Sequence, residues 1–133
     1  MTQALLAFEK LKLGIPTLSY EFFPPKSPES WSTLYSSLGE VAKQNLDFVS
    51  MTYGAGGSTR EKMVDLVGRI QNELGVETVA HLTCGGHSRD ELRQILDQLQ
   101  SAGVHAIMAL RGDPLRGEKT SLFIRTDLPM PVI

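Results

Sequence analysis

The feature that most limits how this 133-residue chain can fold is a repeated order of short β-prone run, loop and amphipathic segment. The β-prone runs cover residues 17–23, 48–52, 77–83 and 106–110. Their starts recur roughly every 30 residues, which is the length of one βα unit. Runs that are almost continuously apolar are typical of strands buried on both faces by flanking helices. The sequence therefore predicts an α/β fold in which parallel strands, four in these runs, alternate with helices.

Helical stripes and capping signals fill the segments between the strands. A leading helix is predicted over residues 2–12, and apolar stripes follow over 31–41, 63–74 and 92–99. Polar start signals precede these stripes: Ser27 before Pro28, and capping boxes formed by Ser58 with Glu61 and by Ser88 with Glu91. Gly75 and Gly103 predict the ends of the last two helices. A doubly wound open sheet and a (β/α)₈ barrel both satisfy this pattern, and spacing alone does not separate them.

Composition excludes several classes of function. With 41% hydrophobic and 21% charged residues the chain has the make-up of an ordinary globular domain. A net charge of -2 provides no basic face for nucleic acid. No apolar stretch reaches the ~18 residues that span a bilayer, and the first residues do not resemble a signal peptide, so we expect a cytoplasmic protein without membrane contact. The single cysteine, Cys84, fits a reducing compartment and excludes a structural zinc site.

A polar block follows each predicted strand. The blocks run from Glu21 to Lys26, from Thr52 to Gly57, from His81 to Cys84 and from Arg111 to Pro114. In parallel α/β folds the catalytic groups gather where strands lead into the following helices, because those loops meet on one side of the scaffold. We therefore expect a functional site built from these four strand ends.

Glu21 is the most informative residue of the first block, because it interrupts an otherwise apolar strand. A charge there is costly unless it faces a cavity or a partner. One interpretation is a buried salt bridge, for which Arg111 is the candidate partner. The other is a carboxyl group in a cleft, where burial shifts the pKa toward values that suit proton transfer.

The second and third blocks allow plainer interpretations. The glycines at 54–57 suggest a dinucleotide-binding loop, but Thr59 stands where the third glycine of that motif belongs, so a flexible βα loop is favoured. His81 by itself is most simply a core histidine, with a base or a ligand as the alternatives. It lies on the same side of its strand as Thr83, which allows it to face a site near the strand end.

Taken together, the four blocks resemble the methylenetetrahydrofolate reductase family. The likeness extends over residues 1–119 and depends on Ser19 to Lys26, Met51 to Gly57, His81 to Cys84 and Ala109 to Pro114. The resemblance implies a partial (β/α)₈ TIM barrel containing FAD. It also implies reduction of methylenetetrahydrofolate to methyltetrahydrofolate, with electrons from NADH or NADPH. A homo-oligomer is expected for the full-length enzyme.

The resemblance also assigns roles to residues. Glu21 is similar to the general acid, which protonates the folate so that its methylene bridge opens to an iminium ion. Asp113 is similar to an aspartate beside the flavin ring, where a negative charge favours hydride donation and stabilises the cation. The other positions that resemble flavin contacts are Thr52, Tyr53, His81, Leu110, Arg111 and Gly112. No metal ligand is implied.

Length adds a second set of hypotheses. A (β/α)₈ barrel usually needs ~250 residues, so residues 1–120 are expected to form the N-terminal half of the catalytic barrel. The chain then contributes half of an active site or is a non-catalytic partial product, and an unrelated parallel α/β binding module is a third possibility. Residues 121–133 are expected to be an irregular tail without periodicity. We hypothesise a reading-frame change there, because a shifted frame of permitted codons gives a family-like His-Pro turn and helix start.

Overall fold

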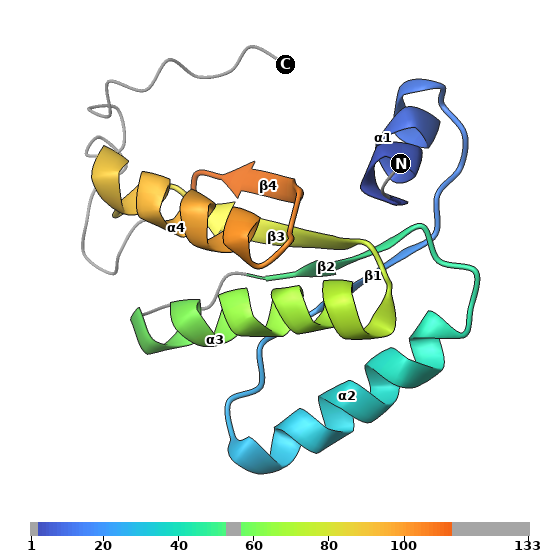
Figure 1. Ribbon diagram of the computed structural model, residues 1–133, viewed down its shortest axis with the longest axis horizontal. Helices are drawn as coiled ribbons and strands as arrows, with labels where there is room; N and C mark the ends of the chain where they lie inside the picture. The colour runs from blue at the N-terminus through green and yellow to red at the C-terminus, as the bar shows by residue number, and fades with distance from the viewer. Residues whose placement is uncertain (1–2, 53–56, 113–133) are drawn as a thin grey trace.

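The computed structural model describes residues 3–52 and 57–112. Helices and strands alternate along the chain in the order α1 (Gln3–Lys12), β1 (Ser19–Phe22), α2 (Pro28–Ala42), β2 (Phe48–Met51), α3 (Gly57–Arg69), a π-helical turn η1 (Ile70–Leu74), β3 (Thr78–Thr83), α4 (Arg89–Ser101) and β4 (Ala106–Leu110). Figure 1 shows this arrangement. The predicted leading helix and the four predicted strands are confirmed, with bounds shifted by two residues or fewer.

The sheet order decides between the two architectures that the sequence left open. All neighbouring strands are parallel, and their spatial order β1-β2-β3-β4 is the order of the chain. A doubly wound sheet reverses its strand order at a switch point, whereas a barrel adds each strand beside the previous one. The described strands therefore form part of a (β/α)₈ barrel.

One face of the sheet carries the core. The strand residues Phe22, Val49, Met51, Ala80 and Leu82 alternate with residues of the opposite face, and they pack with apolar side chains of α2, α3 and α4. Figure 1 shows α3 and α4 lying along the strands. The opposite face, called the open face below, carries Glu21, Ser50, Val79, His81, Thr83, Met108 and Leu110.

Burial on both faces, which the sequence predicted, holds only for the central strands. Most residues of β2 and β3 are buried, but most residues of β1 and β4 are exposed. The reason is that an outer strand has a neighbour on one side only, and that α2, α3 and α4 cover only the core face. The apolar residues of β4 thus reflect a buried environment that the described part of the chain does not itself provide.

Two of the predicted helix starts are confirmed: Ser27 stands at the N-cap of α2 before Pro28, although its side chain makes no capping hydrogen bond, and Ser88 caps α4. Ser88 accepts a hydrogen bond from the Glu91 backbone N–H at 3.2 Å, and the Glu91 carboxylate accepts one from the Ser88 N–H at 2.7 Å, which completes the predicted capping box. α3 begins at Gly57, and the Ser58 side chain, on which the other predicted capping box depends, lies outside what the structure describes, so that capping box stays a prediction. Leu96 is 39% exposed, because it is rotated away from the stripe that buries Leu92 and its partners.

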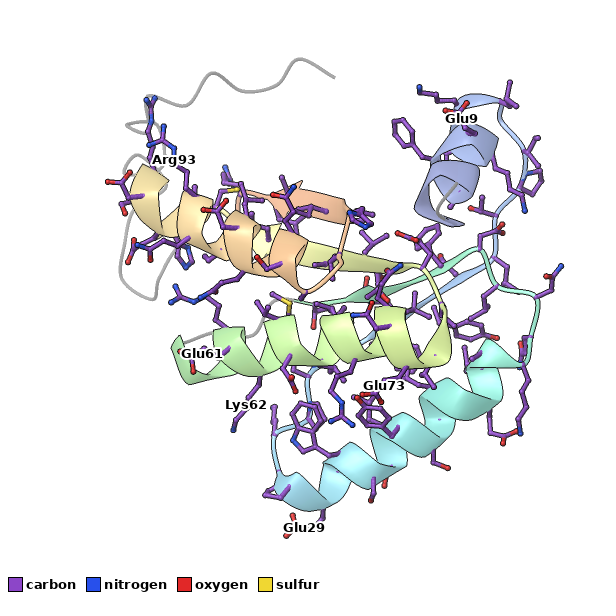
Figure 2. All side chains as sticks on the ribbon, viewed as in Figure 1. Glu9, Glu29, Glu61, Lys62, Glu73 and Arg93 are labelled. Carbon is purple, nitrogen blue, oxygen red and sulfur yellow. The ribbon has the colours of Figure 1, made fainter. Side chains whose placement is uncertain are left out.

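Charged side chains lie on the outer surface of the helices. Glu9, Glu29, Lys62 and Arg93 are exposed on α1, α2, α3 and α4 and project away from the sheet (Figure 2). Among the described residues, no helix is both long enough and apolar enough to cross a membrane.

Candidate functional site

The strand register and the alternation of side chains bring four of the predicted site residues, Glu21, Thr52, His81 and Leu110, to the open face. Glu21 pairs with Ser50 across β1 and β2, and Ser50 pairs with Val79 on β3, two residues before His81. The Thr52 N–H donates to the Phe22 carbonyl at 3.0 Å, which extends the ladder by one residue beyond Met51. Alternation along β2 then places Thr52 on the same face as Ser50. Glu21, Thr52 and His81 therefore meet toward the carboxyl ends of the strands.

Glu21 and His81 form the central contact of this face. Glu21 Oε2 lies 3.9 Å from His81 Nε2, with side-chain exposures of 52% for Glu21 and 7% for His81. His81 and Thr83 lie on the same side of β3, as predicted, because both face β4 residues of the open face. The buried salt bridge between Glu21 and Arg111 is wrong, because Arg111 follows β4, three strands away, whereas the ion contact of Glu21 is with His81.

The described part of the fourth block, Arg111 and Gly112, lies beside the end of β3. The Cys84 N–H donates to the Leu110 carbonyl at 2.7 Å, and the Gly85 N–H donates to the Arg111 carbonyl at 2.8 Å. Gly112 has a φ of +84°, and a Cβ atom built on it would overlap Thr83 Cγ2. Glycine is therefore required here both by its conformation and by its close approach to β3.

Some predicted site residues lie elsewhere or outside the described residues. Leu110 is on the open face at the outer strand, where it is 38% exposed, and Arg111 is exposed just beyond it. Tyr53 and Asp113 lie outside the described residues, so their roles stay predictions. Cys84 packs partly buried against the core, as expected for a small hydrophobe, and burial raises the pKa of its thiol.

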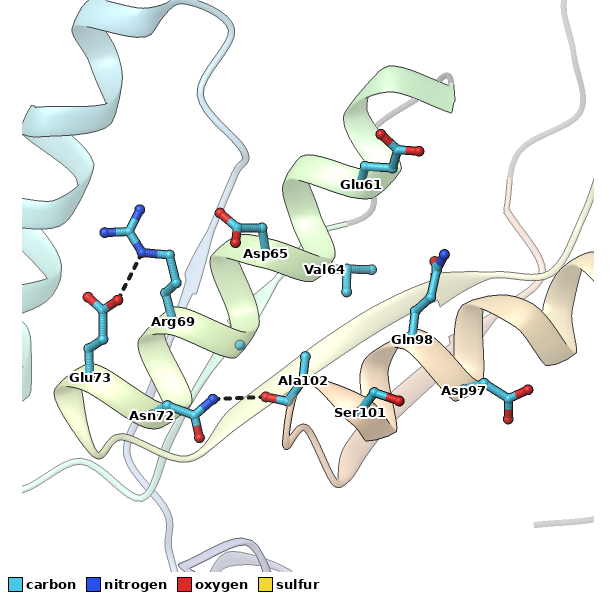
Figure 3. Close-up of a pocket in the computed structure, with 11 residues that line it drawn as sticks. Glu61, Val64, Asp65, Arg69, Asn72, Glu73, Asp97, Gln98, Ser101 and Ala102 are labelled. Carbon is cyan, nitrogen blue, oxygen red and sulfur yellow. Dashed lines mark hydrogen bonds and ion pairs between the residues drawn. The ribbon is translucent and has the colours of Figure 1, made fainter.

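A groove that the sequence did not indicate lies on the outer side, between α3 and α4. Its volume is about 710 Å³, and its lining is Glu61, Val64, Asp65, Gly68, Arg69, Asn72, Glu73, Asp97, Gln98, Ser101 and Ala102 (Figure 3). Gly68 allows the helices to approach here, since its built Cβ would lie 3.0 Å from Ala102 Cβ. The Asn72 side chain donates to the Ala102 carbonyl at 2.9 Å and closes one end. None of the predicted site residues lines this groove.

The described residues contain no group of three or more His, Cys, Asp or Glu side chains that could hold a metal ion. The hydrogen-bonding side chains of the described open face include instead the hydroxyls of Ser50, Thr52 and Thr83 and the imidazole of His81. This donor set suits the carbonyl oxygens and ring nitrogens of an aromatic cofactor, which accept hydrogen bonds from neutral and cationic groups.

Residues 8–127 match the family model described as Methylenetetrahydrofolate reductase. The chain belongs to the methylenetetrahydrofolate reductase family. This membership excludes the interpretation as an unrelated α/β binding module, and it agrees with the barrel-like strand order. The matched residues include all four strand-end blocks.

Relatives in bacteria and plants show the same similarity. The 5,10-methylenetetrahydrofolate reductase of Salmonella typhimurium is 40% identical over 100 residues, which are 75% of this chain and 34% of that protein. The enzyme of the same name from Pectobacterium carotovorum is 37% identical over 111 residues, 83% of this chain and 37% of the relative. Methylenetetrahydrofolate reductase (NADH) 1 of Arabidopsis thaliana is 35% identical over 105 residues, 79% of this chain and 18% of the relative. The chain thus spans well under half the length of these relatives.

Proposed function

We propose that this chain provides the first four strands of the active site of a reductase that converts 5,10-methylenetetrahydrofolate to 5-methyltetrahydrofolate. FAD and either NADH or NADPH are the proposed cofactor and reductant. The observation that supports this most is the meeting of Glu21, Thr52 and His81 on the open face of a family-matched sheet. We further propose a cytoplasmic location and a homo-oligomeric full-length enzyme.

The proposed cofactor fits the donor set of the open face. FAD, when bound, passes a hydride from the nicotinamide to the folate. Thr52 and His81 would hold it from the open face, and Leu110, Arg111 and Gly112 would hold it from the segment after β4. Tyr53 and Asp113 complete the proposed set. The backbone hydrogen bonds from Cys84 to Leu110 and from Gly85 to Arg111 hold this segment beside β3, so the contacts offered by the two strands stay in a fixed relation.

Glu21 is the proposed general acid. Its carboxyl group stands at the end of β1 on the open face, where it can deliver a proton to a folate nitrogen lying over the sheet. Positioned acid catalysis contributes a factor of about 10² to 10⁴ in rate. The carboxyl is 52% exposed in the described structure, so bound substrate and cofactor must exclude water from it before the proton is transferred.

Replacing the acid tests this assignment. In a form of the protein that reduces the folate, Glu21→Gln should keep bound flavin and its reduction by nicotinamide but lose folate reduction, because an amide has no acidic proton. Glu40→Gln is a suitable control, since Glu40 is an exposed helix residue paired with Lys43 at 2.6 Å. Folate reduction by Glu21→Gln at near the parent rate would show that Glu21 is not the acid.

The proposed role of Asp113 has a separate test. Asp113→Asn removes a negative charge without changing the side-chain volume, so the reduction potential of the bound flavin should rise. Potentiometric titration of the two proteins measures this shift. An unchanged potential would place the carboxylate away from the ring.

A second candidate is that the 133-residue chain by itself is a non-catalytic partial product. The observation that favours it is the exposure of most of β1 and β4, including Glu21. We expect the chain alone to bind FAD weakly and to self-associate through its outer strands. Gel filtration of the chain with FAD, followed at visible wavelengths, tests this, and a monomer carrying stoichiometric flavin would contradict it. The bases encoding residues 121–133 test the proposed reading-frame change.

A further inference from the structure

His81 has a buried nitrogen without a hydrogen bond. The side chain is 7% exposed, and Nε2 has no hydrogen-bond partner in the described residues. Buried polar atoms in proteins are nearly always paired, and an unpaired one carries the full cost of its desolvation. The nitrogen therefore indicates an interaction for which the surrounding residues are arranged.

Glu21 is the side chain in place to complete that interaction. Its Oε2 lies 3.9 Å from Nε2, which is longer than the usual hydrogen bond of about 2.7 to 3.2 Å. A rotation about one side-chain bond of Glu21 is enough to close this difference. Because the Glu21 side chain is 52% exposed, it can turn without displacing packed atoms. Ser50, opposite Glu21 on the intervening strand, is small and leaves the path between β1 and β3 open.

No other charged side chain of the strands competes for this contact. Among the described residues of β1 to β4 that belong to the open face, Glu21 and His81 are the titratable ones. Their neighbours on this face are Ser50, Val79 and Met108, which carry no charge. An ionised carboxylate only accepts hydrogen bonds, so the donor in this pair is the imidazole.

We infer that His81 is a positioning residue for Glu21, whose carboxylate accepts a hydrogen bond from the His81 Nε2–H and is thereby held over the open face. The catalytic consequence rests on the proposed function, in which Glu21 delivers a proton. A hydrogen bond to the ionised carboxyl stabilises the state that Glu21 reaches after proton delivery, and it fixes the direction in which the carboxyl points. This role is distinct from a contact between His81 and the flavin.

The hydrogen bond is tested on the chain itself by nitrogen NMR of the His81 ring. We expect the proton on Nε2 in the parent chain, and a change of the Nε2 signal in Glu21→Ala. Glu21→Gln should give a smaller change, because the amide oxygen still accepts. Glu40→Ala is the matched control on α2, and the ring of His105, which is exposed, is the internal reference. Identical His81 signals in the parent and in Glu21→Ala, with an unchanged backbone spectrum, would overturn the inference.

The catalytic consequence is tested in a form of the protein that reduces the folate. His81→Gln keeps an N–H near the position of Nε2 and should keep most of kcat, whereas His81→Leu should lower kcat about tenfold or more with little change in KM. Rates are expressed per bound flavin, read from the visible spectrum, so that a loss of the proposed flavin contact of His81 is separated from a loss of positioning. Parental kcat per bound flavin in His81→Leu would refute the positioning role. If the parent reduces no folate although the His81 Nε2 signal depends on Glu21, the proposed function fails but the hydrogen bond between His81 and Glu21 stands.

Discussion

Replacing Gly112 with alanine tests whether the segment after β4 depends on the absence of a side chain. Gly112 has a φ of +84°, and an added Cβ would overlap Thr83 Cγ2. An alanine in the left-handed conformation costs about 1–2 kcal/mol, and forcing an extra carbon into a packed position costs about 1–3 kcal/mol. Restricting the unfolded chain offsets roughly 0.4–1 kcal/mol of this. We therefore expect the free energy of unfolding to fall by about 1–4.5 kcal/mol.

Two further variants separate the conformational cost from the steric cost. Gly86 has a φ of +80° in the loop after β3, and nothing lies within 4 Å of a Cβ built there. Gly86→Ala should thus show only the conformational cost. In Gly112→Ala with Thr83→Ala the overlapping methyl group is gone, and the next contact is Thr83 Cβ at 3.7 Å, an ordinary van der Waals distance. The double-mutant cycle between positions 83 and 112 should therefore recover about 1–3 kcal/mol.

Urea denaturation followed by circular dichroism measures all of these variants under one condition. Gly112→Ala should be the most destabilised, and Gly86→Ala and the double variant relative to Thr83→Ala should show smaller losses that are similar to each other. Equal losses for Gly112→Ala and Gly86→Ala, together with a coupling below about 0.5 kcal/mol, would refute the close approach of this segment to β3.

Three other predictions concern local interactions that the structure defines. Ser88→Ala should lower the free energy of unfolding by about 1 kcal/mol, measured in urea, and Ser88→Asp should restore it; equal losses in both would contradict the cap. The hydrogen bond from the Ser88 backbone N–H holds the pKa of Glu91 in the folded protein below its usual 4.5. The parent should therefore be more stable than Glu91→Gln, with the full difference present above pH 4.5 and lost as the pH falls through the pKa of Glu91 in the folded protein. Thermal melting across the acid range measures this difference, and a constant gap would rule it out. Asp47→Ala removes the 2.5 Å ion pair with Lys10 and should speed backbone hydrogen exchange in α1, because this ion pair ties α1 to the segment before β2. Glu9→Ala, which removes a 3.8 Å ion pair within α1, should not, and equal exchange rates in the two variants would contradict the prediction.

Local sequence signals predicted most of the elements of the fold. The Ser88 and Glu91 pair set the start of α4 because both hydrogen bonds of a capping box lie within one turn of the chain. Gly75 ended the third helical segment because its φ of +63° is readily available to glycine. At α3 the helix begins at Gly57, two residues before the start that a cap at Ser58 predicts. Such local signals carry little information about the exact turn at which a helix nucleates.

The sequence proposed residues for the candidate site but did not predict the contacts between them. The sequence alone identified Glu21 and His81, because a charge and an imidazole within apolar strands require a reason. It did not identify them as partners, since a contact between β1 and β3 depends on the register of both strands with β2. A salt bridge between Glu21 and Arg111 was also chemically reasonable, but it does not form because β1 and β4 are the two outer strands of the sheet.

The sequence by itself thus determined the number and type of the strands and helices, the start of α4 and the residues that stand at the strand ends. These features follow from interactions between residues near one another in the chain. Only the tertiary structure decided that the strands add in chain order, that the helices share the core face, and that Glu21 faces His81. Those outcomes depend on how separate βα units pack, and hydrophobic burial, being non-directional, does not specify that from sequence pattern alone.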